Sequence, residues 1–512
     1  MISKINSIAV NGIISDLIEV EVDINSGLPS FTIVGLPDQG VQESKERLRS
    51  ALKSSQAKLP TARITVNLAP ADIKKSGANF DLAIAVGILN HEGIINDDYL
   101  SDSIFVGELS LDGKLRKISG ALPSTIGAME KKFKRIFLPL ENVLEASIVP
   151  DIDVIGVSCL SDLISMLNKN KPLNIQEKLD FKNIKTDGFL ENKNDFKYIL
   201  GQNHAKRALE IAASGGHNII MNGPPGSGKT MLSKAFASIL PDLTISEAIE
   251  VSKIYSISGL LDSENPIISK RPFRVIHHTA SSVSIIGGGR NAKPGEISLA
   301  HKGVLFLDEV LEFSKSVLEV LRQPIEDGEI TVNRINASLT YPAKFILVGA
   351  MNPCPCGYLT DSDKECICSF KQIENYKSKL SGPLIDRIDI FIEVPKVKTS
   401  EFKISDDYDE KNSSKYIKQR VEKSREIQLN RFKNTRLTFN SEMSTKEINK
   451  YCKLDSECEN ILKQAISSLN LSARSYYRII KLSRTIADLE GCEDIKKEHI
   501  LEALSFRKRE EK

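Results

Sequence analysis

The sequence predicts a multidomain α/β protein, with two α/β domains followed by a helical domain, and three observations support this. The chain has 512 residues, more than a single hydrophobic core usually serves. Short runs near the N-terminus alternate apolar and polar residues, as strands do, whereas apolar residues at helical spacing dominate the C-terminal part. Between these regions lies a glycine-rich motif of the kind that joins a strand to a helix in α/β domains.

Polar segments give the expected boundaries between domains. In the first domain, alternating runs at 18–23 and 63–67 predict strands, and an apolar stretch at 82–89 predicts a helix. Two longer polar segments predict linkers. We therefore expect a mixed α/β domain at 1–168, a linker at 169–196, an α/β core at 197–397, a second linker at 398–415 and a helical domain at 416–512.

The net charge and the pattern of apolar residues argue against a globally basic protein and against a secreted or membrane-spanning one. The formal net charge is +2, so the chain has no global basic field, and any contact with nucleic acid has to be local. The first residues, Met1 to Lys4, do not lead into the apolar core of a signal peptide, and no apolar run reaches the ~20 residues that span a bilayer. We therefore expect a cytoplasmic protein without a membrane partner.

The strongest motif is a phosphate-binding loop. The segment GPPGSGKT matches the pattern GxxxxGK[ST], and it lies between an expected strand at 217–221 and an expected helix at 231–240. A chance glycine-rich loop is the alternative, and these flanking elements argue against it. Backbone amides of the loop are expected to bind phosphates, Lys229 the β and γ phosphates, and Thr230 Mg²⁺. The loop residues are Gly223, Pro224, Pro225, Gly226, Ser227, Gly228, Lys229 and Thr230.

Two further strands end in polar residues that suit ATP chemistry. An apolar run at 303–307 leads to Asp308, expected to hold Mg²⁺, and to Glu309, expected to be the general base for the attacking water. A buried strand with a solvated acidic end is the alternative. A third strand at 344–350 precedes Asn352, which we expect to orient that water, although an asparagine after a strand is otherwise a turn residue.

This series of motifs resembles that of AAA+ ATPases, which act as rings. The segment around Arg387 resembles the one that carries the arginine finger, which implies that Arg387 reaches the ATP of a neighbouring subunit. The segment around Arg474 resembles the start of the lid helix with the second sensor, which implies a contact with the γ-phosphate in the same subunit. Arg478 and Arg484 compete for this second role, and a surface or ion-pairing arginine is the alternative for both roles.

Two insertions narrow the resemblance. Three consecutive glycines, 287–289, predict a mobile loop, and alternating residues at 328–341 predict a β-hairpin. Both insertions resemble those of the magnesium-chelatase-like branch, where they point into the pore of a ring. The sequences of the motifs at 277–279, 294–296 and 381–387 are most similar to those of the YifB/ComM family. This resemblance covers nearly the whole chain.

The resemblance to this family implies a homo-oligomeric, hexameric motor that uses ATP and Mg²⁺ on DNA. ComM is associated with branch migration during natural transformation, which implies helicase or translocase activity here. The candidate DNA contacts are Arg290, Lys293 and Arg334. A chelatase-type or unfoldase-type ATPase that remodels a protein is the alternative.

The first domain resembles the Lon protease domain, which has a ribosomal protein S5 domain 2-like fold. In the best register, Asn79 replaces the catalytic serine and Leu122 the catalytic lysine. An amide and an alkyl chain cannot form a nucleophile and base, which implies a domain without peptidase activity. A shifted register with Ser76 and Lys117 is the alternative. The resembling segments are 75–80 and 107–120.

Four of the eight cysteines lie close together in the sequence with CxC-x9-CxC spacing. Four thiols within so short a segment suit a tetrahedral Zn²⁺ site, and disulfides are rare in a reducing cytosol. Reduced thiols in a surface loop are the alternative. The cysteines are Cys354, Cys356, Cys366 and Cys368.

Overall fold

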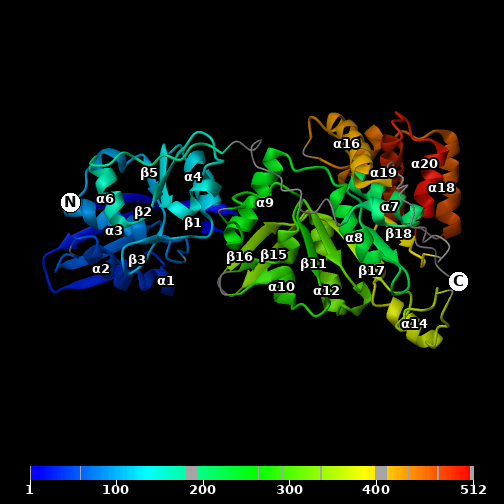
Figure 1. Ribbon diagram of the computed structural model, residues 1–512, viewed down its shortest axis with the longest axis horizontal. Helices are drawn as coiled ribbons and strands as arrows, with labels where there is room; N and C mark the ends of the chain where they lie inside the picture. The colour runs from blue at the N-terminus through cyan, green and yellow to red at the C-terminus, as the bar shows by residue number, and fades with distance from the viewer. Residues whose placement is uncertain are drawn as a thin grey trace.

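The computed structural model has three parts along its long axis (Figure 1). The N-terminal α/β domain and the C-terminal helices lie at opposite ends of a central α/β domain. Half of the first expected linker, 180–193, and most of the second, 398–411, lie outside the described residues. The structure describes residues 2–57, 59–75, 77–179, 194–262, 264–289, 292–334, 337–361, 363–397, 412–435, 437–469 and 472–507.

A mixed seven-stranded sheet forms the N-terminal domain, in the order β3-β4-β2-β1-β5-β8-β9. The predicted strands at 18–23 and 63–67 lie within β2 and β4, and the predicted helix at 82–89 within α3. In β2, Ile18, Val20 and Val22 are buried, which accounts for the alternation in the sequence. The strands are β1 (Ser3–Asn11), β2 (Ile14–Asn25), β3 (Ser30–Val34), β4 (Arg63–Ala69), β5 (Ser103–Phe105), β8 (Arg135–Pro139) and β9 (Asp153–Val157), and the main helices are α2 (Ser44–Ser54), α3 (Asp81–His91), α4 (Ala121–Glu130) and α6 (Leu160–Leu167).

The central domain contains a five-stranded parallel sheet in the order β11-β14-β17-β10-β18. The predicted strands at 217–221, 303–307 and 344–350 correspond to β10, β14 and β17, and the predicted helix at 231–240 to α8. Helices on both faces bury β14 completely, so its sequence is a continuous apolar run. The strands are β10 (Ile219–Asn222), β11 (Phe273–Ile276), β14 (Val304–Leu307), β17 (Ile346–Met351) and β18 (Ile390–Glu393), and the main helices are α7 (Asn203–Gly215), α8 (Lys229–Ser238) and α9 (Ile245–Ser258).

The two insertions form neighbouring β-hairpins. The predicted hairpin at 328–341 is confirmed as β15 (Glu329–Arg334) and β16 (Ala337–Pro342). The glycine run, however, is not an irregular loop, because Gly287 and Gly288 form strand β12 (Gly287–Gly288), which pairs with β13 (Lys293–Pro294). A Cβ on Gly287 would lie 2.5 Å from the carbonyl oxygen of Lys293, so the pairing itself requires glycine. The buried Tyr341 hydroxyl donates to the Ala292 carbonyl at 2.9 Å and joins the two hairpins.

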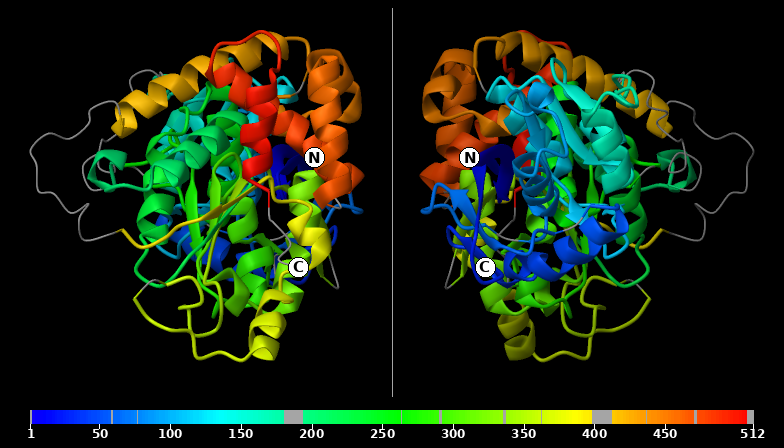
Figure 2. Two further views of the ribbon diagram at one scale, coloured as in Figure 1. Left: turned by 90° about the vertical axis from the view of Figure 1, so that its right-hand side faces the viewer. Right: turned by 90° about the vertical axis from the view of Figure 1, so that its left-hand side faces the viewer.

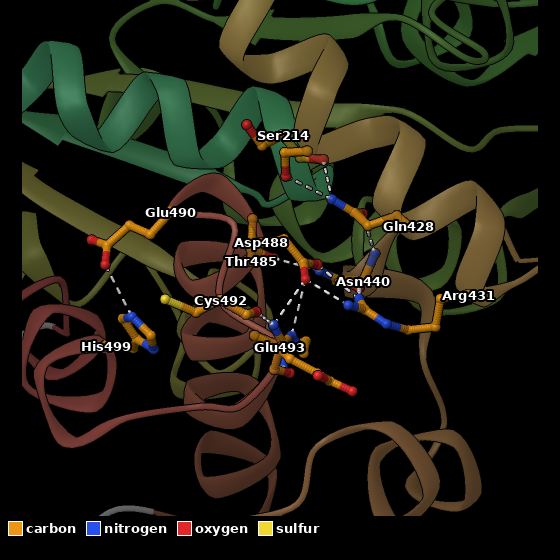
Figure 3. Close-up of polar contacts among 12 residues, drawn as sticks. Ser214, Gln428, Arg431, Asn440, Thr485, Asp488, Glu490, Cys492, Glu493 and His499 are labelled. Carbon is orange, nitrogen blue, oxygen red and sulfur yellow. Dashed lines mark hydrogen bonds and ion pairs between the residues drawn. The ribbon is translucent and has the colours of Figure 1, made fainter.

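The C-terminal helices pack along one edge of the central domain (Figure 2). A polar network holds them there (Figure 3), in which Asp488 accepts hydrogen bonds from Arg431, Arg484 and Asn440 at 2.5–3.1 Å. Thr485 Oγ1 lies 2.8 Å from Nε2 of His217, two residues before β10. The network therefore holds these helices against the five-stranded sheet of the central domain. They are α16 (Ser414–Arg431), α17 (Thr445–Tyr451), α18 (Ser456–Leu469), α19 (Ala473–Leu489) and α20 (Lys497–Ser505).

The N-terminal domain contacts the central domain through α4, which packs on α9. The backbone N–H of Gly120 donates to the Ser256 carbonyl at 3.0 Å, and the Lys117 ammonium donates to the Leu261 carbonyl. Leu122 is fully buried at this joint. Lys117, the alternative peptidase base, is therefore bonded to the neighbouring domain, and Ser76 lies outside the described residues.

Within the part of the chain that the structure describes, no helix is long and apolar enough to cross a membrane.

Candidate nucleotide-binding site

The phosphate loop joins β10 to α8 and depends on glycine at three positions. Gly226 and Gly228 have φ values of +78° and +89°, which side chains of L-residues rarely allow. A Cβ on Gly223 would lie 2.2 Å from the carbonyl oxygen of Val394. Helix α8 begins at Lys229, directly after the loop, so its free N-terminal amides and its dipole favour an anion at this place.

Three sequence motifs meet around one cavity of about 420 Å³. The phosphate loop supplies one wall from Pro225 to Met231. Asp308 and Glu309 follow β14 and Asn352 follows β17, so parallel strands bring these side chains to the same edge of the sheet. The structure therefore gathers the predicted residues of all three motifs at a place that fits a nucleoside triphosphate.

The Lys229 ammonium lies among uncharged hydrogen-bond acceptors. Its Nζ donates to the carbonyl oxygens of Gly223 and Pro224 at 2.5 and 2.9 Å, and it lies 3.4 Å from Oδ1 of Asn352. Burial lowers the pKa of Lys229 to about 8, although the charges of Asp308 and Glu309 act in the opposite direction. A bound phosphate would give this cation the stronger partner that it lacks.

We expect ATP binding to weaken above pH 8 because of Lys229. In the free protein this amine has a pKa of about 8, whereas bound phosphates would keep it protonated. Well below pH 8 binding needs no proton uptake, but well above it each further pH unit lowers the affinity about tenfold. The dissociation constant measured by calorimetry should therefore rise about tenfold from pH 7 to pH 9.

The matched control for this pH dependence is Lys229→Arg. A guanidinium does not lose its proton in this range, so the variant should show a flat profile whatever its affinity. A flat profile in the wild-type protein would contradict the lowered pKa.

Oxygen ligands for a magnesium ion lie beside the loop. Thr230 Oγ1 lies 3.4 Å from Oδ2 of Asp308, and both atoms face the cavity that would hold the phosphates. A hydroxyl and a carboxylate are ligands that Mg²⁺ accepts, together with phosphate oxygens and water. The donor set at this position therefore fits Mg²⁺.

Glu309 has a histidine partner that the sequence did not reveal. Its Oε2 lies 3.4 Å from Nδ1 of His278, whose ring lies 4.2 Å from that of His277. The two histidines directly follow β11, the neighbour of β14, so their position after a strand was the signal that could have identified them. His278 therefore lies beside the carboxylate that is the candidate base, although its Nδ1 forms no hydrogen bond among the described residues.

The predicted arginine finger and the predicted second sensor converge on one carboxylate, that of Glu326. Arg387 donates to the Pro383 carbonyl at 2.7 Å and forms an ion pair with Glu326, and Arg474 donates to the same carboxylate at 2.6 Å. The hydrogen bond from Arg387 lowers the pKa of Glu326. Among the described residues, no hydrogen bond or ion pair joins either guanidinium to the phosphate loop of its own chain. The structure thus brings Arg387 and Arg474 together.

The other two candidate arginines have structural partners. Arg484 is 2% exposed and bonds Asp488 and the carbonyls of Cys492 and Glu493. Arg478 donates to Asp389 at 2.5 Å. Although burial opposes ionisation, Arg478 and His217 hold the pKa of Asp389 below its usual range. These contacts account for both arginines within the fold.

Among the described side chains, those of the cysteine cluster and of Lys293 do not line the cavity. The four cysteines of the cluster come together after Asn352, with all their sulfur atoms within 4.8 Å of one another. Lys293 is exposed on β13. Arg334 ends β15, and Arg290 lies outside the described residues.

The strand order, the phosphate loop after β10, the acidic pair after β14 and the asparagine after β17 define the class of the central domain, a phosphate-loop domain of the AAA+ type. Three family profiles match the chain. They are described as "Magnesium chelatase, subunit ChlI" at residues 195–402, "Subunit ChlI of Mg-chelatase" at 20–142 and "Magnesium chelatase, subunit ChlI C-terminal" at 411–507.

Relatives extend this similarity over the whole chain. Competence protein ComM of Haemophilus influenzae is 43% identical over 97% of this chain and 95% of its own length. The uncharacterized protein YifB of Escherichia coli is 38% identical over 99% of this chain and 97% of its own length. The magnesium-chelatase 38 kDa subunit of Cereibacter sphaeroides is 26% identical over 31% of this chain and 52% of its own length. The chain belongs to the YifB/ComM family of magnesium-chelatase-like proteins.

Proposed function

We propose that the protein is a cytoplasmic ATPase that assembles into a hexameric ring and moves on DNA in branch migration.

 The convergence of Lys229, Asp308 and Glu309 on one cavity carries the ATPase part of this proposal. Lys229 and the loop amides would bind the phosphates, and Thr230 with Asp308 would hold Mg²⁺, which neutralises phosphate charge. Glu309 would take the proton of the attacking water, and Asn352 would orient that water.

The arrangement of Arg387 and Arg474 supports action between subunits. Sequence resemblance assigns Arg474 to the nucleotide of its own chain, but its guanidinium shares Glu326 with Arg387. We infer that both arginines face the ATP of the neighbouring subunit, with Glu326 holding them in place. An arginine supplied by a neighbour makes hydrolysis depend on assembly, as a ring motor requires.

The outer domains have supporting roles in this proposal. We infer that the N-terminal domain is Lon-like without peptidase activity, because Asn79 and Leu122 replace the required pair and Lys117 is bonded to the central domain. The C-terminal helices would serve as the lid, since the contact between His217 and Thr485 joins them to the start of β10.

The two hairpins are the candidate DNA contacts. Lys293 is exposed on one hairpin and Arg334 ends the first strand of the other, and the bond from Tyr341 to Ala292 holds the hairpins together. The relative named competence protein ComM supports DNA as the substrate. The similarity to magnesium-chelatase subunits favours protein remodelling as the second candidate, although the 38 kDa subunit itself aligns with only 31% of this chain.

We expect the triple variant Arg290→Ala, Lys293→Ala, Arg334→Ala to lose DNA affinity by at least about tenfold, with a shallower dependence on salt. Contacts between cations and phosphates release counterions, and a ring multiplies each contact by its number of subunits. Basal ATP turnover should stay within about twofold of wild type, because the three residues belong to the two insertions and not to the nucleotide motifs. Fluorescence anisotropy with single-stranded, duplex and branched DNA at several salt concentrations measures the effect.

The matched control is Lys45→Ala, Arg49→Ala, Lys53→Ala, which removes the same charge from the exposed face of α2. This variant should bind DNA as the wild type does. Equal DNA affinity in both triple variants would contradict the hairpin assignment. Absence of DNA binding by assembled wild-type rings would favour the protein-remodelling function instead.

A further inference from the structure

Four cysteine side chains converge beside the phosphate loop, outside the lining of the nucleotide cavity. The Sγ atom of Cys354 lies 3.4 Å from that of Cys356 and 3.6 Å from that of Cys366. Cys356 and Cys366 are also 3.6 Å apart, and Cys368 completes the group. A disulfide would join its sulfurs at about 2.05 Å, so these are separations of ligands around an ion rather than of bonded sulfurs.

The geometry of the four sulfurs suits a single tetrahedral ion. With zinc–sulfur distances of about 2.3 Å, tetrahedral ligands lie about 3.8 Å apart, close to the separations found here. The backbone N–H of Cys356 donates to Sγ of Cys368 at 3.4 Å, as suits a sulfur that carries negative charge. A four-iron cluster would set its sulfurs farther apart, because each cysteine binds a different iron atom.

The turn that holds two of the cysteines lies against the phosphate loop. Gly357 has a φ of +83°, and its N–H donates to the Cys354 carbonyl at 3.0 Å, which closes a tight turn between two of the ligands. This turn lies on the phosphate loop, since a Cβ on Gly357 would be 2.7 Å from Cδ of Pro225. Asn352, the candidate water-orienting residue, precedes the first ligand by two positions.

The second pair of cysteines leads into another structural element. Ser369 follows Cys368 and caps helix α14 (Phe370–Lys377) through a capping box with Gln372. After this helix, Lys379 donates at 2.8 Å to the carbonyl of Leu311, which follows β14 in the chain. An ion bound by all four cysteines would therefore join the end of β17 to the start of α14, next to the phosphate loop.

We propose that Cys354, Cys356, Cys366 and Cys368 bind one zinc ion, and that this ion fixes the phosphate loop and Asn352 in the arrangement needed for ATP turnover. Four thiolates leave no open position on the ion, which is the pattern of a structural site. The binding of zinc is independent of the protein's activity. The role of the ion in positioning the phosphate loop and Asn352 rests on the proposed ATPase function.

Metal analysis of the full chain tests the site itself. Protein purified under reducing conditions without chelators should contain about one zinc per chain, and Cys354→Ser with Cys366→Ser should contain less than a tenth of that. Cys159→Ser, a change outside the cluster, should retain the zinc. Replacement by cobalt should give the absorption bands of a tetrahedral tetrathiolate site in wild type and not in the double variant.

Gly357→Ala tests the coupling to the ATP site without removing a ligand. The added methyl group meets Pro225, so the variant should keep its zinc while ATP turnover falls at least about tenfold through misplacement of the loop. Gly93→Ala is the matched control, because Gly93 has a similar φ of +68° but nothing within 4 Å of its added Cβ. This control should keep both zinc and turnover.

The outcomes separate the two parts of the proposal. The zinc site is overturned if the wild-type protein holds no tightly bound metal or holds iron in place of zinc. It is also overturned if the double serine variant retains its zinc. Removal of zinc by a chelator should slow ATP turnover, and added zinc should restore it. Unchanged turnover after removal overturns the coupling. Wild-type protein that holds zinc but hydrolyses no ATP overturns the proposed function and the coupling, and leaves the metal site standing.

Discussion

Replacing Glu309 with glutamine is expected to lower ATP turnover at least about a hundredfold while ATP affinity changes by less than about threefold. The amide has the shape of the carboxylate but cannot take a proton from water. Thr230 and Asp308, 3.4 Å apart, remain in place as ligands for Mg²⁺, and Lys229 still faces the phosphates. Phosphate release measures the turnover, and calorimetry measures the affinity.

The matched control for this variant is Glu312→Gln. Glu312 is exposed three residues farther along the chain and does not line the nucleotide cavity, so its replacement removes the same charge without removing a candidate base. Its turnover should stay close to that of wild type. Near-wild-type turnover in Glu309→Gln would contradict the assignment of Glu309 as the base.

The residues that meet at the nucleotide cavity could be predicted because each one directly follows a strand. The buried runs of β14 and β17 are continuous and apolar, which identifies them as strands of a parallel sheet. Parallel strands carry Asp308 and Asn352 to the same edge as the phosphate loop. Their proximity therefore follows from local patterns and one rule of sheet geometry.

The contacts that sequence reasoning missed depend on packing between distant segments. Glu326 holds Arg387 and Arg474, which are 61 and 148 positions away, and no local spacing encodes such a meeting. The position of Lys117 at a domain joint likewise depends on how α4 packs against α9. The glycine run at 287–289 predicts a mobile loop, but glycine serves both flexibility and the close approach of backbones, and the strand pairing of Gly287 requires the second.

Replacing Arg387 with alanine is expected to lower ATP turnover about a thousandfold or more while ATP binding persists. If Arg387 acts on the neighbouring subunit, mixing this variant with Glu309→Gln should restore activity. In an equimolar ring, half of the sites have an intact Glu309 and half of their neighbours supply an intact Arg387, so about a quarter of wild-type turnover should return. The mixture of Lys229→Ala with Glu309→Gln is the control, because both changes affect the same site within one subunit and should not complement each other.

The same mixing experiment determines the role of Arg474. Because Arg474 and Arg387 share the carboxylate of Glu326, we expect Arg474→Ala also to regain about a quarter of wild-type turnover when mixed with Glu309→Gln. If Arg474 instead served the nucleotide of its own chain, no subunit in the mixture would have both an intact Arg474 and an intact Glu309, and turnover would stay at the level of the separate variants. Recovery with Arg387→Ala but not with Arg474→Ala would assign the two arginines to different subunits' nucleotides. Absence of recovery with both, in rings shown by mass spectrometry to be mixed, would contradict the action of either arginine across the interface.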